Sequence, residues 1–186
     1  MSRIMGLVLL LAWSGAMAAP PAAKPRRNGA ACAVWQRELA FARSVQRHDA
    51  AAFASHVADD AVFDANTATP THGRDAIREH WAAIIAGKNV QLSWYPQQVV
   101  TTADGTLAYS SGAYLLVTQP SADKPASERI GRFATVWRRG RDRVWRVAFD
   151  GGDEARPATA AQVAAFRAGR RDACPRDTPA GSDPGA

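Results

Sequence analysis

The hydrophobic pattern of this chain changes period near residue 88, and that change limits the possible fold more than any other feature. Before it, apolar residues recur at helical spacing over the ranges 31–47, 49–56 and 73–87, with a short strand at 61–63. After it, they alternate with the period of a strand over the ranges 90–100, 106–118, 128–138 and 143–150. Helices followed by a run of strands predict an α+β fold in which a strongly curved antiparallel sheet wraps around the helices.

Proline, glycine and capping residues mark the ends of several elements. Pro96 interrupts the first long strand and indicates a sheet edge or a bulge, because proline has no N–H to donate. Asp49 caps the second helix, and Gly87 stops the third. Thr159 is placed to cap a last helix that runs through Arg171. The sequence therefore predicts a C-terminal helix after the sheet.

The first 18 residues have the layout of a secretory signal peptide. Arg3 precedes a compact apolar run, and small residues follow it, with Ala16 and Ala18 in the A-x-A arrangement of a cleavage site. We therefore predict cleavage after Ala18 and a periplasmic or secreted protein; a buried N-terminal helix is the alternative. The apolar run is shorter than the ~20 residues that a membrane span needs, so we expect no stable membrane insertion.

A single domain is expected over residues 31–174. Residues 19–30 are rich in Pro, Ala and Arg and are typical of a linker, and residues 175–186 are typical of a disordered tail. The chain has two cysteines, Cys32 and Cys174, close to the two ends of this domain. In an oxidising compartment we expect them to form a disulfide; two buried thiols or a reactive site are the alternatives.

The net charge of +6 and the pI of about 10.0 suggest an anionic partner such as nucleic acid. Other features argue against that interpretation. The positive charge is nearly all arginine in an alanine-rich chain, which is typical of a biased codon pool, and the arginines at 138–146 straddle a hairpin tip, where they would be solvated. The sequence has no RNP-like or helix-turn-helix signature, so we expect no nucleic-acid partner.

A curved sheet wrapped around helices encloses a cavity, and the chain has many large side chains to line it. The candidates for a ligand pocket are Trp35, Phe53, Phe63, Trp81, Trp94, Tyr114, Phe133, Trp137 and Asp150. Such a pocket would bind a small apolar or aromatic molecule. The alternative is that these aromatic side chains simply fill the core. Asp150 ends the last strand, so its carboxylate either points at the pocket mouth or accepts backbone N–H groups in the following turn.

Several strings and their order carry a family resemblance: VADDAVF at 57–63, HGRDAI at 72–77, VWRR at 136–139, and WRV at 145–147 followed by Asp150. Together they resemble the nuclear transport factor 2-like superfamily, and within it the SnoaL-like and ketosteroid-isomerase-like branch and its secreted members of unknown function. The resemblance implies a cone-shaped α+β barrel with a deep pocket, and it implies a homodimer.

The resemblance also implies a catalytic test. The general base of ketosteroid isomerase corresponds to Asp64, eight residues before the His72-Gly73 pair; the alternative is that Asp64 only forms a turn. The two oxyanion-hole positions correspond to Phe41 and Phe133, and neither ring can donate a hydrogen bond. The sequence therefore does not carry that isomerase mechanism. Tyr109, Tyr114 and His80 are conceivable substitutes that would reach into a pocket.

The histidines do not have the spacing of a metal site, so we expect no metal and no cofactor. We therefore predict an exported protein that binds a small molecule in an aromatic-lined pocket. One alternative is a lyase, isomerase or hydrolase that uses Asp64 as general base on a small hydrophobic substrate. The other is a homodimeric interaction module with a vestigial pocket.

Overall fold

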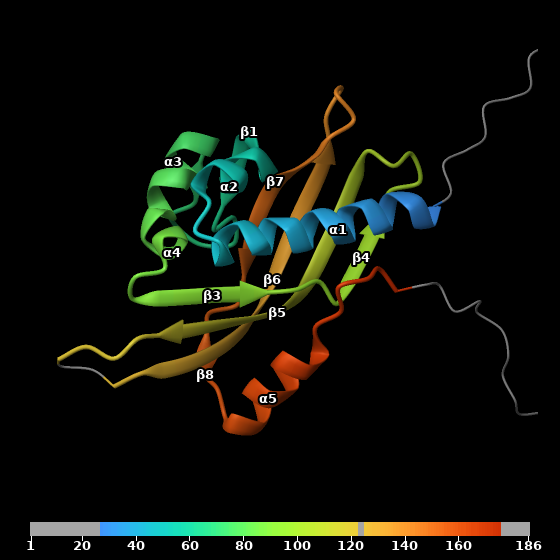
Figure 1. Cartoon of the computed structure of the whole chain (residues 1–186). Coiled ribbons are helices and arrows are strands. Elements are labelled where there is room, and N and C mark those ends of the chain that lie inside the picture. Colours follow the sequence, from blue (N-terminus) through green and yellow to red (C-terminus); the bar gives the residue numbers. More distant parts are fainter. Residues whose placement is uncertain (1–26, 123–124, 176–186) are drawn as a thin grey trace, which may run out of the picture.

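The structure, a computed structural model, describes residues 27–122 and 125–175 (Figure 1). The predicted signal peptide, residues 1–18, and almost all of the predicted tail lie outside these residues. Five helices are present: α1 (Arg27–Gln46), α2 (Ala50–His56), α3 (Arg74–His80), α4 (Ala82–Ala86) and α5 (Ala160–Gly169). α1 begins at Arg27, inside the range 19–30 that its composition indicates is a linker. Ala30, in this first part of the helix, packs against the core.

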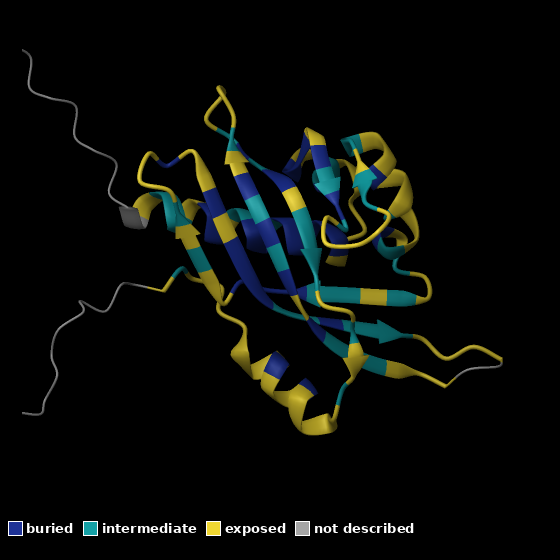
Figure 2. Cartoon of the chain, turned by 180° about the vertical axis from the view of Figure 1, so that it is seen from behind, coloured by how far each residue is buried: buried dark blue, intermediate teal, exposed yellow. Residues whose placement is uncertain are grey.

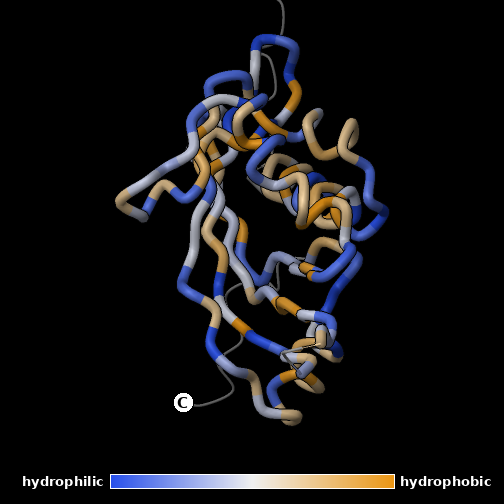
Figure 3. Tube along the Cα trace, turned by 90° about the vertical axis from the view of Figure 1, so that its left-hand side faces the viewer, coloured by the Kyte–Doolittle hydropathy of each residue, from blue (hydrophilic) through white to orange (hydrophobic). Residues whose placement is uncertain are grey.

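Eight strands form one curved sheet with the order β2-β1-β7-β6-β5-β3, with β4 beside β5 and β8 beside β6. They are β1 (Val57–Phe63), β2 (Thr71–His72), β3 (Val90–Trp94), β4 (Gln98–Thr101), β5 (Leu107–Thr118), β6 (Ser127–Arg139), β7 (Trp145–Gly152) and β8 (Arg156–Pro157). In the side view of Figure 3 the strands form one layer and helices α1 to α4 another. The α+β prediction is confirmed.

The sheet departs from the predicted antiparallel barrel in two ways. β1 pairs with β7 in parallel, so the sheet is mixed. It also does not close, because β2 and β3 end the strand order without pairing with each other. Hydrophobic alternation reports which face of a strand is buried and carries no information about which strand lies beside it.

Two predicted elements are each split in the structure. The strand expected over 90–100 becomes β3 and β4, both paired with β5, because Pro96 cannot donate to the ladder. The helix expected over 73–87 becomes α3 and α4, separated by Trp81 at φ −88° and ψ −1°. Gly87 ends α4 in the left-handed conformation, at φ 64°, as expected for a helix stop.

The core lies between α1 and the inner face of the sheet, where Figure 2 shows the buried residues concentrated. Phe41 on α1 is at its centre, with its ring centroid 5.1 Å from that of Phe53, 5.3 Å from that of Trp94 and 6.1 Å from that of Trp137. A second cluster lies under α5. It contains Trp35, Leu39, Tyr95, Leu115, Val163 and Phe166.

Cys32 and Cys174 form a disulfide, with their Cα atoms 5.3 Å apart, and so the predicted pairing is present. The bond joins α1 to the segment after α5 and spans 142 residues of sequence. A link of this span removes much conformational freedom from the unfolded chain. No helix within the described ranges is long and apolar enough to cross a membrane.

Glu38 connects α1 to three strands of the sheet. Its side chain is fully buried, and its carboxylate accepts hydrogen bonds from Trp94 Nε1 at 2.7 Å and from Trp137 Nε1 at 2.9 Å. The hydroxyl of Ser110 also donates to it. Burial raises the pKa of Glu38, while these three donors oppose the rise. The carboxylate thereby holds β3, β5 and β6 against one helix.

Glu38→Ala should be strongly destabilising. It leaves two buried indole N–H groups and a hydroxyl without their acceptor, and each such loss costs about 1–3 kcal/mol. We expect the free energy of unfolding, measured by urea denaturation, to fall by about 3 kcal/mol or more. Glu79→Ala, on the exposed side of α3, is the matched control and should change stability by less than about 0.5 kcal/mol. Equal losses in the two variants would contradict this assignment.

Candidate functional site

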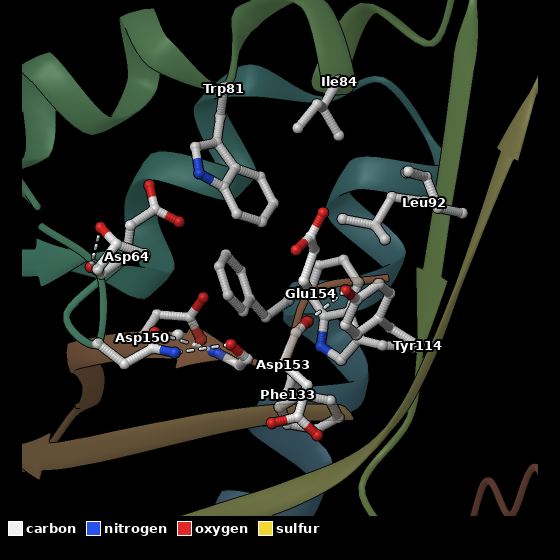
Figure 4. Close-up of a pocket in the computed structure, with 16 residues that line it drawn as sticks. Asp64, Trp81, Ile84, Leu92, Tyr114, Phe133, Asp150, Asp153 and Glu154 are labelled. Atoms are coloured by element: carbon white, nitrogen blue, oxygen red, sulfur yellow. Dashed lines mark hydrogen bonds between the residues drawn. The ribbon is translucent and has the colours of Figure 1, made fainter. Parts of the chain in front are cut away.

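A cavity of about 580 Å³ lies between helices α1, α3 and α4 and the inner face of the sheet (Figure 4). This volume is within the range of small-molecule sites. Its walls are mostly apolar and include five aromatic rings. The apolar lining residues are Phe41, Trp81, Ile84, Leu92, Trp94, Tyr114, Leu116 and Phe133.

Strand pairing explains how one wall is built. Tyr114 and Leu116 are two residues apart on β5, so both side chains point to the same face. Trp94 and Leu92 on β3 lie directly opposite them in the antiparallel register and point the same way. The Tyr114 hydroxyl donates to the backbone oxygen of Asp153 at 2.7 Å, which ties this wall to the segment after β7.

Asp150 is the polar group set deepest in the cavity wall. It lies on β7, opposite Thr135 on β6, whose hydroxyl donates to Asp150 Oδ1 at 2.5 Å. Burial raises the pKa of Asp150 to about 8, the charges of Glu38 and Asp64 add to the rise, and the Thr135 hydroxyl opposes it. At neutral pH the Asp150 carboxyl group is therefore protonated in most molecules, and in that form it can donate a hydrogen bond into the cavity. Of the two orientations left open by the sequence, the side chain takes the one toward the pocket.

Asp64 combines the two roles that the sequence left as alternatives. Its backbone is left-handed, at φ 54°, and its carbonyl accepts hydrogen bonds from the N–H and the hydroxyl of Thr67, both at 2.9 Å. Its carboxylate nevertheless lines the cavity. The side chain is 41% exposed and lies 3.6 Å from His80 Nε2, so solvent reaches it. Asp64 is therefore a turn residue at the cavity mouth rather than a desolvated base.

The structure brings five predicted pocket residues together around the cavity: Trp81, Trp94, Tyr114, Phe133 and Asp150. Four others do not line it. Phe53, Phe63 and Trp137 are completely buried among the core rings, and Trp35 belongs to the cluster under α5. Their inclusion in the pocket is a correction, because aromatic content and strand alternation do not distinguish a ring that fills the core from one that faces a void.

Two further candidates lie outside the lining. Tyr109 is five residues before Tyr114 on the same strand, so it points to the opposite face of the sheet, where it is 40% exposed. His80 is on α3 at the cavity mouth, with its side chain 60% exposed. The two phenylalanines at the expected oxyanion positions, Phe41 and Phe133, do line the cavity. Neither ring supplies a hydrogen-bond donor there.

Sequence reasoning missed the loop side of the cavity. Asn66, Gly151, Gly152, Asp153 and Glu154 contribute to the lining. The Asn66 side-chain amide donates to the backbone oxygen of Gly152 at 2.7 Å. A Cβ atom on Gly152 would lie 2.3 Å from the backbone oxygen of Arg132, so this close approach requires glycine. The Gly-Gly pair directly after Asp150 was the only signal for this contact.

Within residues 27–122 and 125–175, no group of three or more His, Cys, Asp or Glu side chains is placed to hold a metal ion. The polar side chains that line the cavity carry four carboxyl groups, the Asn66 amide and the hydroxyls of Thr67 and Tyr114.

The raised pKa of Asp150 predicts a pH-dependent stability. In the unfolded chain its pKa is about 4, so between about pH 4 and pH 8 the folded protein holds a proton that the unfolded chain releases. This contribution to the free energy of unfolding falls as pH rises through that window. Asp150→Asn stays neutral throughout and keeps an oxygen for Thr135. Its stability relative to wild type should increase by at least about 1 kcal/mol between about pH 5 and about pH 7.5.

Urea denaturation at several pH values measures this difference. Asp75→Asn, at an exposed position on α3, is the control, and its stability relative to wild type should not follow the same trend. A difference between Asp150→Asn and wild type that does not change with pH would show that Asp150 is ionised in the folded protein.

Solved structures with this architecture share little sequence with the chain. A nuclear transport factor 2-like superfamily protein from Salmonella enterica matches with a TM-score of 0.55 and 13% identity, covering 71% of this chain and 94% of that one. A ketosteroid isomerase-like protein from Erwinia carotovora matches with a TM-score of 0.54 and 16% identity, covering 66% and 96%. A nuclear transport factor 2-like protein of unknown function from Pseudomonas putida matches with a TM-score of 0.53 and 19% identity, covering 72% of this chain and 92% of that one. At these identities the likeness establishes the fold alone.

None of the curated proteins compared with the chain matches it. A family model does match, over residues 39–170, which include the second part of α1, the other four helices, the whole sheet and the cavity. The chain therefore belongs to the SnoaL-like domain family, and its fold is the one seen in these nuclear transport factor 2-like structures.

Proposed function

We propose that this chain is an exported protein that binds a small, mainly apolar or aromatic molecule in the cavity described above. The single observation that carries the proposal is the cavity itself, because a pocket of about 580 Å³ bounded by five aromatic side chains exposes apolar surface to water. An apolar ligand would remove this surface from water, which favours binding.

Asp150 adds a means of orienting such a ligand. Its protonated carboxyl group would donate to a carbonyl, ether or hydroxyl oxygen on an otherwise apolar molecule. The nearby Tyr114 hydroxyl is already used by the Asp153 carbonyl, so it is not available as a second donor. A few polar groups within a mostly apolar wall are the usual composition of a small-molecule site.

Export is supported by the signal-peptide layout of residues 1–18 and by the disulfide. Disulfides persist in oxidising compartments and are rare in the reducing cytosol. The Cys32–Cys174 bond is consistent with a protein that matures outside the cytoplasm.

Filling the cavity should abolish ligand uptake. Leu116 lines the cavity, and Leu116→Trp places a larger ring in the void. We expect its affinity for an apolar dye, followed by fluorescence, to fall by at least about tenfold, which corresponds to about 1.4 kcal/mol. Leu107→Trp makes the same change at the exposed end of the same strand, and it should bind the dye like wild type. Equal binding by all three proteins would place the ligand elsewhere.

An acid–base enzyme is the second candidate for the same cavity. Asp150 favours it, because a carboxyl group with a pKa near 8 exchanges protons at neutral pH. Asp64 is the weaker choice for the base that this candidate needs, since its side chain is open to solvent. If wild type and Asp150→Asn turned over the same substrate at equal rates, this role for Asp150 would be ruled out.

A homodimer through the outer face of the sheet is a further proposal, supported by a row of apolar side chains. Val100, Tyr109, Val136 and Phe149 lie in register across β4, β5, β6 and β7, and therefore share one face. Val100 and Phe149 are each 49% exposed. Figure 2 shows the outer face of the sheet, on which α5 covers the part around Leu115 and not the apolar row. An exposed apolar row across four strands is unusual on a monomer surface.

Phe149→Glu tests the dimer by placing a charge at one end of the row, on its most exposed aromatic side chain. We expect the mature protein to be dimeric and the variant to be monomeric by native mass spectrometry and analytical ultracentrifugation. Ala82→Glu, which adds the same charge on the exposed side of α4, should leave the dimer intact. A monomeric wild-type protein would contradict the proposal.

A further inference from the structure

We propose that the cavity selects a positively charged ligand, namely a molecule whose apolar or aromatic body carries an amine or another organic cation. This inference rests on the proposed function, since it assigns a ligand class to the same cavity. It starts from the charges of the lining residues.

Four of the residues that line the cavity are acidic, and no lining residue is Lys, Arg or His. The acids are Asp64, Asp150, Asp153 and Glu154. Because Asp150 is mostly protonated at neutral pH, the negative charge of the cavity comes from the other three. The whole chain has 23 Lys and Arg against 17 Asp and Glu, so chance placement would favour the opposite sign. The cavity is thus an acidic region in a basic protein.

The carboxyl groups approach the void from more than one side. In Figure 4 the side chains of Asp64 and Asp150 lie on one side of the cavity, and the side chain of Glu154 lies across from them, between Trp81 and Tyr114. A cation between these groups would lie within reach of carboxylates on both sides. A low-dielectric wall strengthens such an attraction relative to water.

Most of these acids have no internal counterion. Within the described part of the chain, Asp150, Asp153 and Glu154 form no ion pair, and Asp64 faces only His80, at 3.6 Å. By contrast, the exposed acids Asp59 and Asp142 are each paired with an arginine. Within the described residues, no arginine or lysine therefore neutralises the acids around the cavity through an ion pair.

One arginine lies close to the loop side. The Arg129 guanidinium donates to the backbone oxygen of Ala155, and its charge reaches the Tyr114 side chain, but the residue is not part of the lining. The charges acting on Asp150 are those of Glu38 and Asp64, and both are carboxylates. The same negative charges would attract a bound cation.

The aromatic rings suit the same ligand. A cation over the face of an indole or phenol ring is attracted by its quadrupole, most strongly for tryptophan. Trp81, Trp94 and Tyr114 all line the cavity, with the carboxyl groups set among them. An anionic or purely apolar ligand would leave these carboxylates without a counterion.

Three pyrene derivatives of nearly equal size test the inference: pyrenemethylamine, pyrenemethanol and pyrenecarboxylate. Fluorescence titrations of the full-length mature protein at neutral pH measure their affinities. We expect the amine to bind at least about tenfold more tightly than the alcohol and the carboxylate to bind most weakly. The advantage of the amine should shrink as salt is added, because salt screens the attraction.

Variants connect this preference to the acids. Asp64→Asn combined with Glu154→Gln should lower the affinity for the amine much more than the affinity for the alcohol, so that most of the amine's advantage is lost. Asp172→Asn removes a negative charge beyond α5, away from the cavity, and should leave the preference as in wild type.

The outcomes separate the two proposals. Equal affinities for amine and alcohol, or a preference for the carboxylate, would overturn the cationic ligand and leave the cavity as a binding site. Failure of all three derivatives to bind would overturn the proposed binding function itself. A loss of amine preference in Asp172→Asn equal to that in the double variant would trace the effect to net charge and would also overturn the inference.

Discussion

The carboxylate of Glu38 is the interaction on which the rest of this architecture depends. It is completely buried on α1 and accepts hydrogen bonds from Trp94, Trp137 and Ser110, which belong to three different strands. A buried carboxylate is expensive unless donors surround it, and here one acidic group collects three of them. Because indole N–H groups can only donate, the sheet must stay in register with α1 for all three bonds to form.

This constraint also shapes the cavity. Trp94 is held by Glu38 at its indole nitrogen while another part of its ring lines the void. Below the cavity, Phe41, Phe53, Phe63 and Trp137 pack edge to face and leave no room for a ligand. The charge of Glu38 further contributes to keeping Asp150 protonated, which links the core to the chemistry of the site.

The two faces of the sheet pack against different parts of the protein. Tyr114 and Leu116 face the cavity, so Leu115 and Val117 between and beside them face outward, where α5 packs. The Cys32–Cys174 disulfide joins the end of that packing to α1, on the cavity side. The rest of the outer face carries the row from Val100 to Phe149, which is available for a partner.

The sequence by itself determined the fold class, the caps at Asp49 and Thr159 and the break at Pro96, because each depends on local periodicity or on one residue's backbone chemistry. It also predicted the disulfide, because the chain has two cysteines and so one possible pairing. Only the tertiary structure decided the parallel β1–β7 pairing, which rings face the void, and that Asp150 rather than Asp64 is the desolvated carboxyl. The acidic lining and the role of Glu38 also escaped prediction. Burial, charge and hydrogen bonding at these positions depend on neighbours brought together from distant segments, and no local pattern records those neighbours.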